Sequence, residues 1–227
     1  MNAEKLVERA KMEAGRRNYP GAVEYFLQAL TIDPGHREAR RGAREAALKQ
    51  YENAYPSGAA RFLGGIGPRI ALALTRDRRR RMEAIEKLLA NDPRNRELGM
   101  RLGALAEAEN LPLAAAAAYE GVSLGNPQDV ESLKALGRVL HSQKLIDEAI
   151  AVMEKAVALA PRDAEVQRLR KDVAADGYAR DAGFSGAKTT HDLLKDREHS
   201  RQLEKKGRIV RGADDLAAHA AEARAAA

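Results

Sequence analysis

Five arginines crowd into six residues of this chain, with only Asp77 between them. They are Arg76, Arg78, Arg79, Arg80 and Arg81. Guanidinium groups at this density bind anions, which would belong to an acidic protein, a nucleic acid or an anionic lipid. The alternative is a solvated helix surface, and the absence of interleaved aromatic residues favours that alternative by a small margin. We keep the five arginines as a candidate anion patch.

No other arrangement of residue types indicates chemistry at a reacting centre. The chain has no cysteine, which excludes disulfides, cysteine nucleophiles and cysteine-ligated metals. Its five histidines are scattered, and His191 and His199 do not have the i, i+4 spacing of a helical metal pair. The segment 183–190 resembles a phosphate-binding loop, but Ala182 and Ala187 stand where that motif needs glycine. We predict no catalytic residue, no metal, no cofactor and no enzyme.

A recurring proline indicates which elements position the charged residues. Pro93, Pro127 and Pro161 are 34 residues apart, and Pro34 lies in a similar short sequence earlier in the chain. A period of this length is typical of helical hairpins stacked in a row. Proline ends the second helix of each hairpin, because its ring cannot continue the helix.

The apolar residues follow the same period. With each proline counted as position 32, large residues fall at positions 4, 7, 11 and 24 and small ones at 8, 20 and 27. In the last unit they are Leu133, Leu136, Gly137, Leu140, Ala149, Met153 and Ala156. The small residues let two helices approach closely, and the large ones fill the space between them.

This pattern resembles the tetratricopeptide repeat family. The resemblance implies an all-α, right-handed solenoid of stacked helical hairpins, here with an irregular second unit and a C-terminal helical extension. It also implies that the protein binds other proteins and catalyses nothing. The match departs from the family pattern at Glu13 and Gly99, which stand where large residues are usual.

The expected organisation has five parts, of which the second is irregular. A first hairpin spans 1–34, an irregular or degenerate region with the arginine cluster spans 35–93, two regular hairpins span 94–161, a capping helix spans 162–176, and a polar helical or partly mobile tail spans 177–227. The irregular region is either a second unit with a weakened second helix and then a half-unit, or an inserted helix and loop before a degenerate unit. Its apolar run at 62–74 could enter a membrane interface, but burial against neighbouring helices is the preferred interpretation.

The resemblance places the partner site on the concave surface, which the first helices of the hairpins line. The corresponding residues are Glu97, Met100, Arg101, Glu107, Glu131, Lys134, Arg138 and His141. Lys134 and Arg138 share a helix face and could hold a carboxylate or an acidic peptide, with Arg101 approaching from the preceding unit. The alternative is an ordinary mixed-charge surface. Co-chaperone members of the family clamp a terminal carboxylate with asparagines and lysines, but Glu8 and Ala104 occupy asparagine positions here, so we do not predict that function.

Charge and composition bound the function. The net charge of +6 arises between residues 35 and 81, where twelve basic residues face four acidic ones. We predict a non-catalytic scaffold or adaptor that holds a partner peptide or helix in its concave groove. The alternatives are an RNA- or ribosome-associated scaffold that uses Arg76–Arg81 and the basic tail, and a self-assembling scaffold. No apolar run is long enough to span a membrane and no signal sequence is evident, so we expect a cytoplasmic protein, and its Ala- and Arg-rich composition suggests a bacterial source.

Overall fold

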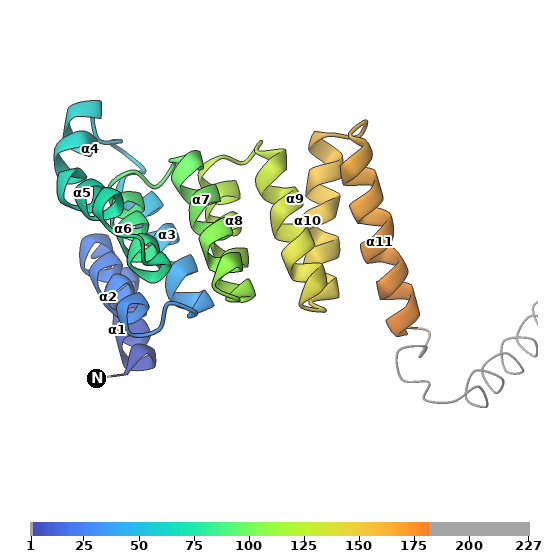
Figure 1. Ribbon diagram of the computed structural model, residues 1–227, viewed down its shortest axis with the longest axis horizontal. Coiled ribbons are helices and arrows are strands. Elements are labelled where there is room, and N and C mark those ends of the chain that lie inside the picture. Colours follow the sequence, from blue (N-terminus) through green and yellow to red (C-terminus); the bar gives the residue numbers. More distant parts are fainter. Residues whose placement is uncertain (1, 182–227) are drawn as a thin grey trace, which may run out of the picture. The chain divides into compact units, whose positions relative to one another are not determined.

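The computed structural model describes residues 2–181, and every regular element in that range is an α-helix (Figure 1). The all-α, solenoid prediction is therefore confirmed for this part of the chain. The helices are α1 (Ala3–Gly15), α2 (Tyr19–Ile32), α3 (Arg37–Gln50), α4 (Gly58–Gly64), α5 (Ile66–Leu74), α6 (Arg78–Asn91), α7 (Arg96–Ala108), α8 (Pro112–Gly125), α9 (Val130–Ser142), α10 (Ile146–Leu159) and α11 (Ala164–Asp181). Residues 1–177 form one compact unit. The tail expected at 177–227 falls almost wholly outside the described residues.

The hairpins form because each helix has a defined start and a defined stop. Side chains cap the first helices of the regular hairpins: Asn95 accepts from the Leu98 N–H at 3.1 Å, and Asp129 accepts from the Ser132 N–H at 3.0 Å. The recurrent prolines lie in the loops that follow α6, α8 and α10. Because α6, α8 and α10 begin at Arg78, Pro112 and Ile146, the 34-residue period extends back to α6.

The turn inside each regular hairpin has the same backbone conformation. Arg17, Asn110 and Lys144 have φ values of 62°, 56° and 58°, and each lies between the two helices of its hairpin. A positive φ is uncommon outside glycine, so its recurrence marks one shared turn geometry. The pairs α1–α2, α7–α8 and α9–α10 then pack side by side (Figure 1).

Glycines let the regular hairpins close. A Cβ at Gly103 would lie 2.3 Å from the ring of Tyr119, and a Cβ at Gly137 would lie 2.5 Å from the sulfur of Met153. Both distances are far inside van der Waals contact. The tyrosine ring is rigid, whereas methionine has several rotatable bonds and fills irregular space. The same substitution should therefore differ in cost between the two hairpins.

Gly103→Ala should lower the free energy of unfolding by about 1–2 kcal/mol, because overpacking outweighs the helix propensity that alanine adds. Gly137→Ala should cost less than about 1 kcal/mol, because Met153 can move aside. Urea unfolding followed by circular dichroism measures both. A Gly103→Ala variant as stable as the original chain would show that the α7–α8 contact is not tight.

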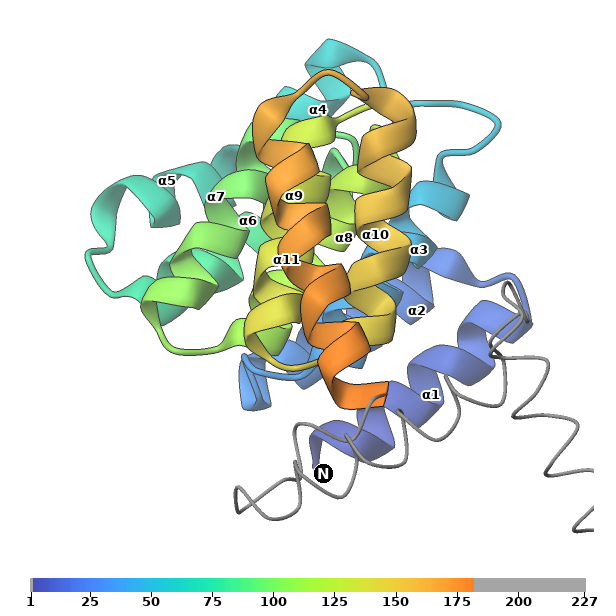
Figure 2. The ribbon, with the colours of Figure 1, turned by 90° about the vertical axis from the view of Figure 1, so that its right-hand side faces the viewer.

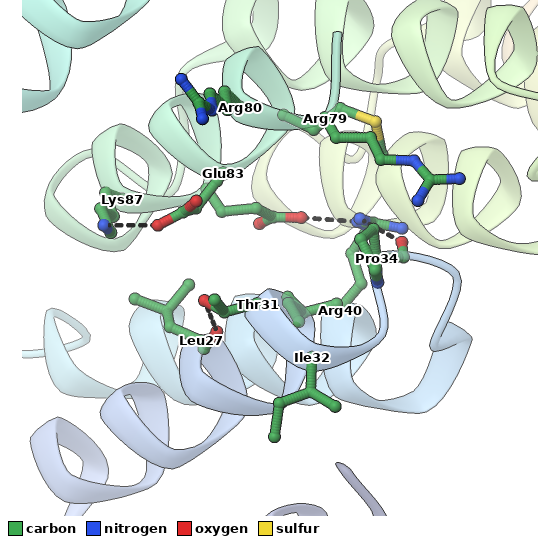
Figure 3. A pocket seen from close by; sticks show the side chains of 12 residues that line it. Leu27, Thr31, Ile32, Pro34, Arg40, Arg79, Arg80, Glu83 and Lys87 are labelled. Atoms are coloured by element: carbon green, nitrogen blue, oxygen red, sulfur yellow. Dashed lines mark hydrogen bonds and ion pairs between the residues drawn. The ribbon is translucent and has the colours of Figure 1, made fainter. Parts of the chain in front are cut away.

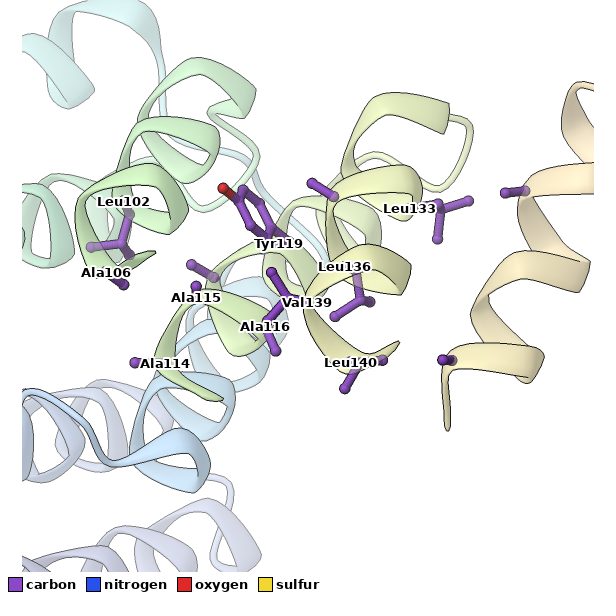
Figure 4. Packing of buried hydrophobic residues seen from close by; sticks show 14 of the residues in the cluster. Leu102, Ala106, Ala114, Ala115, Ala116, Tyr119, Leu133, Leu136, Val139 and Leu140 are labelled. Atoms are coloured by element: carbon purple, nitrogen blue, oxygen red, sulfur yellow. The ribbon is translucent and has the colours of Figure 1, made fainter. Parts of the chain in front are cut away.

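Helix α8 is buried over the middle of its length, although Leu113 and Leu124 near its ends are exposed. It packs against α7, α9 and also α3, which belongs to the N-terminal half. Its five consecutive alanines, Ala114 to Ala118, are all buried, and Ala114, Ala115 and Ala116 are labelled in Figure 4. A helix that is apolar all round is typical of a buried position. The alanine run therefore reflects three close helix neighbours.

The irregular region differs from a regular hairpin. Helix α3 has no second helix of full length after it, and it packs instead against α2 and α8. The short helices α4 and α5 follow, and neither contains a buried residue except at their Gly65 junction. Both lie at the edge of the N-terminal half (Figures 1 and 2). The preferred interpretation that the apolar run at 62–74 is buried is therefore wrong, because only Leu72 of its large residues packs against the core.

Two hydrophobic clusters meet at a polar seam, which we define as Arg40, Arg44 and Glu86. One cluster is formed by α1, α2 and α3, and the other runs from α6 to α11. Arg40 on α3 donates to Glu86 on α6 at 2.5 Å, and both side chains are buried. Arg44 donates to the carbonyl of Pro93 at 3.0 Å, and burial lowers the pKa of its guanidinium. The N-terminal helices are thus joined to the repeats by buried charged groups as well as by apolar contact.

Candidate functional site

The residues expected on the concave surface lie on α7 and α9, and they differ in exposure. Five side chains are exposed, namely Glu97, Arg101, Glu107, Glu131 and Arg138. Met100 is half-buried and packs against the main core. His141 is half-buried and Lys134 is buried. The two helices therefore present a surface of alternating charge, on which not every predicted residue is accessible.

Lys134 is held by acids of its own chain. Its ammonium lies 2.7 Å from Glu131, 2.7 Å from Glu165 and 3.5 Å from Asp163. Hydrogen bonds to Glu131 and Glu165 raise its pKa above the usual lysine range. Lys134 therefore fixes the start of α11 against α9, and its charge is already neutralised.

His141 also contacts helix α11. Its Nε2 lies 2.9 Å from the carboxylate of Asp176, and the Lys144 ammonium lies 3.2 Å from that carboxylate. The contact with His141, followed by that with Lys144, lowers the pKa of Asp176. Val166 and Val173 of α11 are also buried in the main cluster. Helix α11 therefore covers one flank of α9 and uses two of the predicted groove residues as anchors.

Three neighbouring helices contribute to a polar cluster formed by Glu107, Tyr119 and Arg138. The Tyr119 hydroxyl donates to Glu107 at 2.5 Å. Burial, together with this hydrogen bond, raises the pKa of Tyr119, and Arg138 opposes that rise. Tyr119 lies between the helices that carry Leu102 and Leu136 (Figure 4). The cluster therefore marks where α7, α8 and α9 meet at the surface.

Two cations of this surface have no acid partner. Arg101 and Arg138 are exposed, and neither forms an ion pair with another residue in the range 2–181. Exposed guanidinium groups can bind carboxylates in bidentate geometry. Arg101 and Arg138 are therefore the groove cations that remain available to a ligand.

The five arginines of the candidate anion patch do not form one free surface. Arg78 and Arg79 both pair with Glu109, at 3.5 and 3.3 Å. Arg79 and Arg80 project away from each other at the edge of a small cavity of about 190 Å³ between α2 and α6 (Figure 3). Arg81 is half-buried, whereas Arg76 and Arg80 are exposed and pair with no acid in the described part of the chain.

Sequence reasoning missed the charged residues of α3. Arg37 pairs with Glu148 on α10, and Arg41 lies 3.4 Å from Glu120 on α8. With Arg40 and Arg44 they follow i, i+3, i+4 and i+7 spacing, which places them on one helix face. That spacing could have indicated from the sequence that the four arginines share one face of the helix. Helix α3 also packs directly on α8, the second helix of the α7–α8 hairpin.

No group of three or more metal-ligating side chains occurs within residues 2–181. None of the helices described in that range is long and apolar enough to cross a membrane.

Comparison with known families gives a match over the regular hairpins. Residues 106–173 match the model of the tetratricopeptide repeat. The resemblance stated from the sequence is confirmed over that range, which includes α8, α9 and α10. Comparison with curated protein sequences gives no significant match.

Several solved structures are similar to the chain. YrrB, described as a TPR protein with an unusual peptide-binding site, is 17% identical with a TM-score of 0.40, and the match covers 79% of this chain and 79% of that chain. A MamA structure from MSR-1 is 20% identical with a TM-score of 0.38, and the match covers 90% and 95%. A thermophilic TPR protein of Thermus thermophilus is 18% identical with a TM-score of 0.37, and the match covers 76% and 99%.

Proposed function

We propose that this chain, a protein with tetratricopeptide repeats at residues 106–173, is a non-catalytic cytoplasmic scaffold that binds an acidic segment of a partner protein. The repeats support a role in protein–protein interaction. The partner segment lies along the surface of α7 and α9, where Arg101 and Arg138 bind its carboxylates. The observation that carries the proposal is that these two guanidinium groups are exposed and have no acid partner within residues 2–181.

The surroundings of Arg138 support the acidic nature of the segment. Lys134 is neutralised by Glu131 and Glu165. Glu107 on α7 keeps its negative charge and accepts a hydrogen bond from the Tyr119 hydroxyl. Among the described residues of α9, the charge that remains unpaired is therefore the positive charge of Arg138. A charge-assisted hydrogen bond contributes about 1.5–3 kcal/mol, so two such contacts suffice to select an acidic segment over a neutral one.

The RNA-associated alternative rests on the candidate anion patch. Two of its five arginines are paired with Glu109, so the patch offers fewer free cations than the sequence implies. The self-assembly alternative has no structural feature that favours it over a separate partner. Nuclease treatment and light scattering separate these alternatives from the proposed function.

Charge reversal should strongly reduce partner recovery. We expect Arg101→Glu/Arg138→Glu in the full chain to recover at least about tenfold less of its main partner from source-cell lysate than the original chain, because two favourable contacts become repulsive. Quantitative mass spectrometry of the nuclease-treated eluate measures this. Arg162→Glu is the matched control, because Arg162 is exposed outside α7 and α9. Equal recovery by the double variant, or a partner lost on nuclease treatment, would overturn the proposal.

A further inference from the structure

Helices α4 and α5 present apolar side chains to solvent. Phe62, Leu63 and Leu74 are 59%, 66% and 80% exposed, and Ile66 and Ile70 are also exposed. Phe62, Ile66, Ile70 and Leu74 recur every four residues, although Gly65 separates the two helices. Scattered exposed apolar residues are normal, but a contiguous set indicates a contact surface.

The backbone of this segment is held in place while its apolar side chains face outward. Arg61 pairs with Asp92 at 3.2 Å, and Asn91 donates to the carbonyl of Gly64 at 3.2 Å. Gly65 is buried, and a Cβ there would lie 3.0 Å from Leu88. Leu72 packs against the main core. The exposure of the other apolar residues is therefore a consequence of how α4 and α5 dock on α6.

The charge around this apolar surface is mostly positive. Seven arginines and a single acid, Asp77, lie between residues 58 and 81. Arg69 lies over the ring of Phe62 at 5.0 Å, and its Nη1 donates to the Phe62 carbonyl. Arg76 and Arg80 line a cleft of about 890 Å³ between α5 and α6, opposite Pro68, Ala71 and Leu74. Apolar side chains and unpaired cations therefore lie next to each other.

We propose that the α4–α5 pair docks on the surface of an anionic lipid bilayer. The apolar side chains of Phe62, Leu63, Ile70 and Leu74 enter the boundary between headgroups and acyl chains, and Arg69, Arg76 and Arg80 contact lipid phosphates. An interfacial element combines an apolar face with basic residues in this way, and it binds more strongly to anionic lipids. Since the exposed side chains protrude from the element, a fluid bilayer accommodates them without a matching groove.

Binding to vesicles tests this proposal with the full chain. We expect co-sedimentation with sucrose-loaded vesicles of phosphatidylcholine and phosphatidylglycerol, and little with phosphatidylcholine alone, because the arginines need anionic headgroups. Leu63→Ser/Ile70→Ser/Leu74→Ser should lower the partition coefficient about tenfold or more, because three apolar side chains leave the interface. Arg76→Gln/Arg80→Gln should lower it and weaken its dependence on salt.

Matched variants keep the result interpretable. Met12 and Leu124 are exposed apolar residues on other helices, so Met12→Ser/Leu124→Ser should bind vesicles like the original chain. Circular dichroism of the triple variant should be unchanged, because none of its three sites is buried. Absence of binding to anionic vesicles, or undiminished binding by the triple variant, would overturn the proposal. A dimer in light scattering that the triple variant converts to a monomer, without vesicle binding, would assign the surface to a second copy of the chain.

Discussion

Replacing Glu86 with glutamine is expected to lower the free energy of unfolding by about 3–5 kcal/mol, the range for breaking a buried ion pair. Glu86 and Arg40 are buried between the two hydrophobic clusters, at an N–O distance of 2.5 Å. The variant keeps the side-chain shape but leaves the Arg40 charge without its anion. The buried Arg44 guanidinium also loses the favourable interaction with Glu86 that offsets part of its burial. Urea unfolding measures the loss.

A control and a paired replacement separate charge from shape. Glu83 lies on the same helix and forms an exposed pair with Lys87 at 2.8 Å, so Glu83→Gln should cost less than about 0.5 kcal/mol. Arg40→Met/Glu86→Leu should be more stable than either single variant, because apolar groups of similar size can replace a buried pair. A Glu86→Gln variant within about 1 kcal/mol of the original chain would show that water reaches the seam.

The regular hairpins could be predicted from the sequence because their rules are local. The 34-residue spacing indicates where the helices end. A small residue is expected on the first helix wherever a large side chain of the second helix of the same hairpin lies against it. Gly103 must be small because the ring of Tyr119 lies against it, and Gly137 faces the more adaptable side chain of Met153. These contacts join residues less than one repeat apart, so the sequence of a single repeat is enough to predict them.

The polar seam and the other ion pairs of α3 could not be predicted because their partners are remote in the sequence. Arg40 and Glu86 are 46 residues apart, and Arg37 and Glu148 are 111 apart. Residue type favours exposure for arginine and glutamate, since such residues are rarely buried unless paired. The count of basic residues between 35 and 81 therefore does not show which of them are buried in ion pairs. Part of that charge instead joins α3 to α6, α8 and α10.

The repeat register indicates which helices carry the candidate groove residues, but not which of their charges remain free. Lys134 and His141 were expected to face a ligand, and they lie on α9 as the repeat register requires. Their acids, Glu165 and Asp176, come from α11, whose docking depends on the burial of Val166 and Val173. The unpaired state of Arg101 and Arg138 is likewise a property of the assembled surface. The groove remains a proposal that partner binding must test.

Substitutions at the contact between Phe26 and Gly42 should have the second large effect on the free energy of unfolding. The effect of Gly42→Ala should change sign when the Phe26 ring is removed. Phe26 is 3% exposed in the cluster of α1, α2 and α3, so Phe26→Ala should cost about 3–5 kcal/mol. Ile32 lies on the same helix but is exposed, so Ile32→Ala should cost about 0.5 kcal/mol or less. Urea unfolding compares the two.

A substitution at Gly42 tests whether the Phe26 ring is fixed in place. A Cβ at Gly42 would lie 2.4 Å from that ring, so Gly42→Ala in the original chain should cost about 1–2 kcal/mol, after the propensity that alanine adds to α3. In the Phe26→Ala background the clash is gone, and the same substitution should stabilise the chain by up to about 1 kcal/mol. Effects of the same sign in both backgrounds would show that the ring moves aside freely. A reversal would establish that close approach of α3 to α2 depends on glycine, and with it the position of the arginines that α3 directs at α6, α8 and α10.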